Sequence, residues 1–280
     1  MTLELRATPE EVMRAVTALE TFAHERGVPE ATIYSLALAL EESGSNVVNH
    51  ALQRDPEQRF RVTLEHADGT FTIELRDRGP GFDPTALARK THAEDADAPG
   101  SWGTELVRRQ MDEVRYTREA GENVLRLTRH FRPATAGNNY AESLKTEYIR
   151  PHNSMPLEIK ILQSLGGQHA GAITVQLTGS LDTATAPELE RQLAPVLGGK
   201  VKDLVFDLAH LKFISSAGLR VFSAARKTLK ERGGQTSFVN MQPQIQKVFE
   251  IMKALPGVAV FQSTAELDHY LAVQQRKQDE

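Results

Sequence analysis

The sequence predicts two domains of different class: an α+β domain with helices on one face of a mixed, mostly antiparallel sheet, then a smaller α/β domain. The chain has 280 residues, near the size at which one hydrophobic core stops growing, so two cores are expected. The first half carries two hairpin signals, about Asp68-Gly69 and about Gly121-Glu122. In the second half, strand-like and helix-like segments alternate.

The first half begins with a strand at residues 2–7, where apolar and polar residues alternate. Thr8 is an N-cap candidate for a helix that should end at Gly27, and Pro29 opens a second helix that should end near Leu52. The elements expected next are strands at 59–66 and 70–76, an aperiodic charged lid at 84–99, a helix from Gly100, and strands at 114–118 and 123–131.

The second half follows an interdomain linker at 132–156, which is rich in Pro, Gly and Asn and could hold a short helix. The domains are therefore expected at 1–131 and 157–280. The elements expected in the second domain are strands at 157–165 and 172–177, a helix from Thr185 or Ala186 to Gly198, a buried central strand at 203–208, a helix from Ser215 or Ser216 to Gly233, a strand at 237–240, a helix at 243–252, a strand at 258–261 and a closing helix at 264–273.

The composition excludes several classes of function. With no cysteine, the chain has no disulfide, thiolate metal site or cysteine nucleophile. The net charge is -4 and Lys and Arg are scattered, so neither nucleic acid nor an anionic membrane is expected as a direct partner. The first residues lack a signal-peptide pattern, and no uncharged apolar run approaches ~20 residues, so we predict a cytoplasmic protein.

The second helix carries a polar pair, Glu42 and Asn46, within an otherwise apolar pattern. Residues four apart lie on one face of a helix. A carboxylate and an amide oxygen so placed could share one divalent cation or one activated water. By itself, such a pair is more often part of a solvated face.

Two glycine-rich segments suggest where a nucleotide could bind. Asp77 ends a strand, where its carboxylate can accept a hydrogen bond from an exocyclic amine such as that of adenine, and Gly79 and Gly81 give the following turn the backbone freedom for a flat ligand to approach. Gly100 and Gly103 start a helix whose exposed N–H groups and dipole favour phosphate.

The order and spacing of these segments resemble the ATP-binding domain shared by gyrase, histidine kinases and MutL, and most of all the anti-sigma-factor serine kinases. The matches are Glu42-x-x-x-Asn46, Asp77-x-Gly79-x-Gly81 and Gly100-x-x-Gly103, with Thr104 following the third. The resemblance implies a two-layer sandwich that binds ATP with Mg²⁺ under a flexible lid. It implies Asn46 as the metal ligand, Asp77 on the adenine amine, Glu42 as the candidate catalytic base, the glycines and Thr104 as further nucleotide-binding residues, and a homodimer.

Residues 213–220 follow a buried strand and open a helix. A serine there is usually an N-cap, but a helix N-terminus also favours a phosphoserine. The segment resembles the STAS domain of anti-sigma-factor antagonists, over residues 157–273. This resemblance implies Ser216 as the phospho-acceptor and an acidic residue, Asp182, near the same surface, while Ser215 stands where a carboxylate often precedes the acceptor.

Together these resemblances imply a protein serine kinase of the anti-sigma-factor type, joined to an antagonist domain, in a bacterial partner-switching circuit. Ser216 of the chain itself or the serine of a separate STAS antagonist would receive the phosphate. A sigma factor or other regulatory protein and a serine phosphatase are the further partners implied. The alternative is a non-catalytic nucleotide-binding regulator or scaffold whose STAS domain recruits a partner. The sequence also leaves open whether the two halves were joined artificially.

Overall fold

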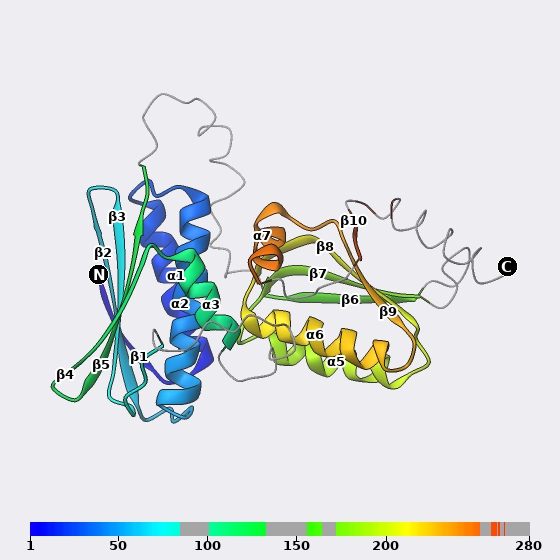
Figure 1. The fold of residues 1–280 in the computed structure, drawn as a ribbon, viewed down its shortest axis with the longest axis horizontal. Coiled ribbons are helices and arrows are strands. Elements are labelled where there is room, and N and C mark those ends of the chain that lie inside the picture. Colours follow the sequence, from blue (N-terminus) through cyan, green and yellow to red (C-terminus); the bar gives the residue numbers. More distant parts are fainter. Residues whose placement is uncertain are drawn as a thin grey trace. The chain divides into compact units, whose positions relative to one another are not determined.

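A computed structural model describes residues 1–84, 101–132, 156–163, 172–252 and 259–261, with the single residues Ser263 and Glu266 (Figure 1). The chain divides into two compact units, residues 1–155 and 156–280. Gly100 and nearly all of the expected lid, linker and closing helix lie outside the described residues. Within the described ranges, no helix has the length and apolar character to cross a bilayer.

The first unit is an antiparallel sheet covered on one side by helices, as predicted (Figure 1). The five strands lie in the order β1-β2-β3-β5-β4, and each neighbouring pair is antiparallel. The strands are β1 (Thr2–Arg6), β2 (Arg59–Ala67), β3 (Thr70–Asp77), β4 (Glu113–Glu119) and β5 (Glu122–His130), and the helices are α1 (Pro9–His24), α2 (Glu30–Asn46), the π-helical turn η1 (Val47–Ala51) and α3 (Ser101–Gln110).

Helix α1 begins and ends as its sequence predicts. The Thr8 hydroxyl accepts a hydrogen bond from the Glu11 N–H at 3.4 Å, which satisfies one of the free donors of the first turn. After the helix, Gly27 adopts a φ of +66°, a conformation that glycine reaches without strain.

Helix α2 is the buried centre of the helical layer. Every residue from Ile33 to Ser45 is buried, so this helix packs on all sides rather than along one stripe. Gly44 allows α1 to pack closely, because a Cβ at this position would lie 2.9 Å from the Val12 Cγ1. The helix ends near Leu52, as predicted, but its last turn is not α-helical: the α-helix ends at Asn46 and continues as η1, in which the Leu52 N–H donates to the Val47 carbonyl at 2.8 Å. A π turn holds an extra residue and rotates the side chains that follow.

Both hairpins of the sheet turn through two residues of positive φ, the geometry that matches strand twist. Asp68 and Gly69 join β2 to β3, as predicted. The second turn lies at Ala120 and Gly121 rather than at Gly121 and Glu122, because Glu122 already pairs with Glu119 at the end of the ladder. The shift places Asn123 second in β5 and opposite Asp77 of β3.

The second unit is the predicted small α/β domain. Its sheet has the order β10-β9-β8-β7-β6, with β6 antiparallel to β7 and the other neighbours parallel. Phe206, Phe222, Phe238 and Phe249 form its aromatic core. The elements are β6 (Glu158–Gln163), β7 (Ile173–Leu181), α5 (Ala186–Gly198), β8 (Asp203–Ile214), α6 (Ser216–Lys230), β9 (Gln235–Val239), α7 (Pro243–Met252) and β10 (Ala259–Phe261).

Two strands of this unit run further than predicted, β7 to Leu181 and β8 to Ile214. The ladder between them contains register shifts, one of them next to Gly179, whose φ is +96°. Such irregularities let strands continue where the alternation of side chains is broken. The two strands therefore end together, beside the start of α6, where the Ser215 N–H donates to the Leu181 carbonyl at 3.0 Å.

Candidate functional site

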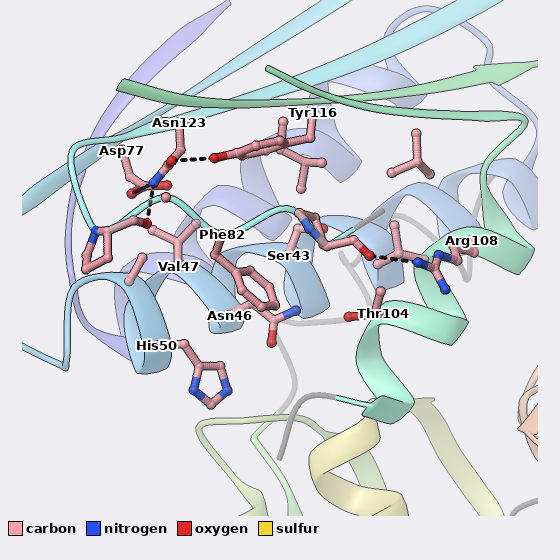
Figure 2. Close-up of a pocket in the computed structure, with 17 residues that line it drawn as sticks. Ser43, Asn46, Val47, His50, Asp77, Phe82, Thr104, Arg108, Tyr116 and Asn123 are labelled. Carbon is pink, nitrogen blue, oxygen red and sulfur yellow. Dashed lines mark hydrogen bonds between the residues drawn. The ribbon is translucent and has the colours of Figure 1, made fainter. Parts of the chain in front are cut away.

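A pocket of about 250 Å³ lies in the first unit between the sheet and the helices (Figure 2). Residues of α2 and η1, the loop after β3, α3, β4 and β5 line it. Apolar side chains form most of its walls; among them are Val47, Val107, Val114 and Leu125. Phe82, in the loop after β3, also lines the pocket and is 46% exposed. Such walls suit a flat, weakly hydrated ring with a few fixed polar contacts.

Asp77 supplies the buried carboxylate of this pocket. It ends β3 and is 7% exposed. Its Oδ1 accepts hydrogen bonds from the Gly79 N–H at 2.8 Å and from the Asn123 Nδ2 at 2.8 Å. Among the described residues, Oδ2 has no hydrogen-bond partner. Asp77 can therefore still accept one hydrogen bond from a ligand in the pocket.

Asn123 is a site residue that the sequence analysis missed. Its Oδ1 accepts a hydrogen bond from the Tyr116 hydroxyl at 2.8 Å (Figure 2). The same oxygen accepts a second hydrogen bond from the Arg118 Nη1 at 2.6 Å. It faces Asp77 because β3 and β5 are neighbours in the sheet. The available signal was an amide at an inward position of a predicted strand, but only the strand pairing shows that it lies beside the carboxylate.

Neither Gly79 nor Gly81 has a positive φ, so their backbone conformation does not itself require glycine. A Cβ at Gly79 would lie 2.6 Å from the carbonyl oxygen of Ala51 in η1, and one at Gly81 would lie 3.2 Å from the Arg118 Nη1. The two glycines therefore make room for protein atoms. Gly81 lines the pocket, whereas Gly79 lies outside its described lining.

The helix that carries Glu42 and Asn46 lines the pocket with a different face from the one that these two residues share. Ser43, Asn46, Val47 and His50 line it, at the spacing of one helical face (Figure 2). Glu42 is 3% exposed and is not among the described lining residues. Asn46 thus belongs to the pocket, and Glu42 lies on the adjacent stripe.

Helix α3 forms the opposite wall. Thr104, 6% exposed, lines the pocket from its first turn, as does Arg108 from its second half. The Arg108 Nη2 donates to the Pro84 carbonyl at 2.8 Å and holds the end of the loop after β3 against α3. Gly103 lies in the helix beside Thr104 but outside the described lining, and Gly100 precedes the described part of α3.

The residues present fit a purine nucleotide. Asp77 Oδ2, which has no hydrogen-bond partner in the described part of the chain, and the apolar walls suit a purine base that carries an amino group. In the described ranges, no three His, Asp or Glu side chains gather to hold a metal. Asn46 offers one amide oxygen, so Mg²⁺ bound here would take its other oxygen ligands from phosphates and water, as this ion commonly does.

The second unit holds the predicted phospho-acceptor at a helix start. The Ser215 Oγ accepts from the Ala217 N–H at 3.3 Å and caps α6, so Ser216 is the first residue of the helix. Ser216 is 3% exposed. Asp182 follows β7 and accepts at Oδ1 from the Ala184 N–H at 2.8 Å and the Thr185 N–H at 2.9 Å. Burial raises the pKa of Asp182, against the opposing effect of the hydrogen bonds from Thr185.

Comparisons with known proteins match each unit separately. Residues 5–129 match the histidine kinase-like ATPase domain and residues 167–267 match the STAS domain. The serine/threonine-protein kinase BtrW of Bordetella bronchiseptica is 30% identical over 134 residues, 47% of this chain and 94% of that protein. The putative anti-sigma factor antagonist BtrV of the same organism is 36% identical over 81 residues, 29% of this chain and 70% of that protein.

Among solved structures, an anti-sigma factor antagonist from Mycobacterium paratuberculosis is 20% identical, with a TM-score of 0.38, over 44% of this chain and 97% of that one. The family matches and the two Bordetella relatives agree on how the chain is built: one part is similar to a kinase, the other to an antagonist. The chain therefore belongs to the histidine kinase-like ATPase family through its first unit and to the STAS family through its second.

Proposed function

We propose that the domain at 1–131 binds ATP with Mg²⁺ and transfers the γ-phosphate to a serine of a STAS domain, as an anti-sigma-factor-type serine kinase in a partner-switching circuit. One observation carries the nucleotide part of the proposal: a buried carboxylate, Asp77, keeps one acceptor oxygen that no described residue bonds, in an apolar pocket that Asn46 also lines. The resemblance of the two halves to BtrW and BtrV supports the transfer part.

Each pocket residue has a proposed role. Asp77 accepts a hydrogen bond from the exocyclic amine of the base, and the apolar walls exclude water from its faces. Asn46 offers its amide oxygen to Mg²⁺, which when bound neutralises phosphate charge. Thr104 and the N–H groups at the start of α3, with Gly103, bind phosphate oxygens. Catalysis then comes mainly from positioning and from charge neutralisation.

Glu42 is the proposed base that takes the proton of the acceptor hydroxyl as its oxygen bonds to the γ-phosphorus and ADP leaves. It stands one turn before Asn46, next to the stripe that lines the pocket. Glu42→Gln would then lower the rate of transfer while leaving the ATP dissociation constant nearly unchanged. Equal loss of binding and transfer would assign Glu42 to packing instead.

The proposed acceptor is Ser216 of this chain or the matching serine of a separate antagonist. Because Ser216 is buried, transfer to it requires the first turn of α6 to open. Once formed, a phosphoserine at a helix N-terminus is favoured by the helix dipole. A sigma factor or another regulatory protein, a serine phosphatase and a second copy of the chain are the proposed partners, in the cytoplasm.

Incubation with γ-labelled ATP and Mg²⁺ tests the proposal. Label should appear on the protein or on an added STAS antagonist, and Asn46→Ala should abolish it. Asn49→Ala is the matched control, because Asn49 lies in η1 outside the described pocket lining and bonds Arg54. Ser216→Ala should remove label from this chain, while Ser223→Ala on the same helix should retain it. Label retained in both Asn46→Ala and Ser216→Ala would refute kinase action.

A second candidate function has some support from the structure, because Glu42 lies outside the described pocket lining and Ser216 is buried. In this case the first unit binds the nucleotide without transferring phosphate, and the STAS domain recruits a partner, with Ser216 in a structural role. Calorimetry that shows ATP binding, together with an unchanged mass after incubation with ATP and Mg²⁺, would favour this candidate. A mass increase of one phosphate would exclude it.

A further inference from the structure

Among the described residues, the pocket carboxylate accepts protein hydrogen bonds on one oxygen alone. Both bonds to Asp77, from the Gly79 N–H and from the Asn123 Nδ2, end on Oδ1 at 2.8 Å. Asp77 is 7% exposed and lines the pocket. Two hydrogen bonds to one oxygen fix the orientation of the carboxylate group. The protein therefore presents the other oxygen, Oδ2, to a ligand in a fixed direction.

The orientation of the Asn123 amide follows from chemistry. Arg118 can only donate hydrogen bonds, and its Nη1 lies 2.6 Å from the atom assigned as Asn123 Oδ1. On the other side, the Nδ2 lies 2.8 Å from the Asp77 Oδ1 and 3.1 Å from the Pro80 carbonyl, which both accept. A flipped amide would set donor against donor and oxygen against oxygen. Arg118 on one side and these two acceptors on the other therefore agree that Asn123 donates to Asp77.

Arg118 is itself held over the loop that follows Asp77. Its Nη1 also donates to the Gly79 carbonyl at 3.2 Å. Gly81 leaves the space that the guanidinium occupies, since a Cβ there would lie 3.2 Å from Nη1. Tyr116 also donates to the Asn123 Oδ1, at 2.8 Å (Figure 2). A hydroxyl can donate or accept, however, so Tyr116 alone would allow either orientation of the amide.

We infer that Arg118 and Asn123 are positioning residues that set the purine selectivity of the pocket. By holding Asp77 as a pure acceptor with Oδ2 toward the ligand, they favour a base that presents an exocyclic amine at that edge. A base that presents a carbonyl there, as guanine does, meets oxygen against oxygen and is rejected. This inference rests on the proposed nucleotide function and names the residues that control its specificity.

The test is the ratio of the GTP and ATP dissociation constants, measured by calorimetry on the full chain. Wild type should prefer ATP. Arg118→Met keeps the aliphatic stem, removes the donor that orients the amide, and should lower the ratio by about tenfold or more, as should Asn123→Ala. Tyr116→Phe should keep the ratio within about twofold, because Arg118 still orients the amide. Arg115→Met is the matched control on β4, since Arg115 pairs with Glu113.

The ratio is insensitive to partial unfolding, because both nucleotides bind the same folded fraction. A merely structural role for Arg118 would weaken both nucleotides equally and leave the ratio unchanged, which would overturn the inference while the proposed function stands. An equal fall of the ratio in Tyr116→Phe and Arg118→Met would also overturn it, because orientation by the arginine would then not be the cause. Failure of the wild type to bind either nucleotide would overturn the proposed function and the inference with it.

Discussion

Replacement of Gly79 by alanine should push the loop after β3 away from η1, and both of these segments line the pocket. The new Cβ would lie 2.6 Å from the carbonyl oxygen of Ala51, whereas ordinary contact begins at 3.4 Å, so the loop after β3 must retreat by about 0.8 Å from η1. Overpacking of this kind costs about 1–3 kcal/mol. Alanine returns about 0.4–1 kcal/mol by restricting the unfolded chain, which leaves a net loss of roughly 1–2 kcal/mol.

Trp102 makes this loss measurable within one domain. It is the only tryptophan of the chain and lies buried in α3, so its fluorescence during urea unfolding reports on the first unit. With a urea dependence of about 2 kcal/mol per molar, the midpoint should fall by roughly 0.5–1 M. The ATP dissociation constant should also rise, because the retreating loop carries the Gly79 N–H that orients Asp77.

Gly81→Ala is the matched control for this prediction. The nearest atom to its new Cβ is the end of the flexible Arg118 side chain, at 3.2 Å, and a side chain can yield where a backbone cannot. The expected shift of the urea midpoint is therefore less than half of that for Gly79→Ala. If both variants unfold at the wild-type midpoint, the close contact between the loop and η1 does not constrain the domain, and the reasoning is refuted.

Three further predictions concern charge and packing. Burial tends to raise the pKa of Glu74, but hydrogen bonds from two arginines outweigh burial and hold this pKa below 4.5. The ionised Glu74 therefore stabilises the fold above pH 4.5, and this stabilisation is lost as the pH falls. Unfolding followed by tryptophan fluorescence should show Glu74→Gln less stable than wild type at pH 7 and equally stable in acid, whereas the exposed Glu65→Gln should show no such pH dependence. Gly218→Ala places a Cβ 2.6 Å from Leu181, the last residue of β7, and should lower the free energy of unfolding by about 1–3 kcal/mol, measured as faster amide hydrogen exchange in α6. Gly198→Ala, where a Cβ meets open space, should leave this exchange unchanged. Ser215→Ala removes the cap of α6 and should cost about 1 kcal/mol, with exchange accelerated first in the opening turn.

Much of the fold followed from local signals. The ends of α1 could be predicted from Thr8 and Gly27, because a helix cap and a glycine of positive φ each act on the adjacent turn of the helix. The Asp68-Gly69 hairpin was equally local. The end of α2 was not, since nothing in residues 47–51 distinguishes a π turn from an α turn. Ala51, at the end of this turn, packs closely against Gly79, which is distant in sequence.

The candidate site divides in the same way. The spacing of Asn46, Asp77 and Thr104 pointed to one pocket, and these three residues line it. Glu42 was grouped with Asn46 because residues four apart share a face, but the pocket lies along the neighbouring stripe that contains Ser43. Helical spacing shows which residues share a face of the helix. Only the packing of the helix on the sheet decides which of these residues line the pocket.

By itself, the sequence determined the two domains and most of their helices and strands, because periodicity, caps and turns act over short distances. Its motifs carried the resemblance to the ATPase and STAS families. Only the tertiary structure decided which groups hold the carboxylate of Asp77. Asn123 donates to it because β3 pairs with β5, and Arg118 acts on it only through Asn123. Strand pairing across such a separation is set by how two faces of the sheet bury their apolar side chains, which no local pattern records.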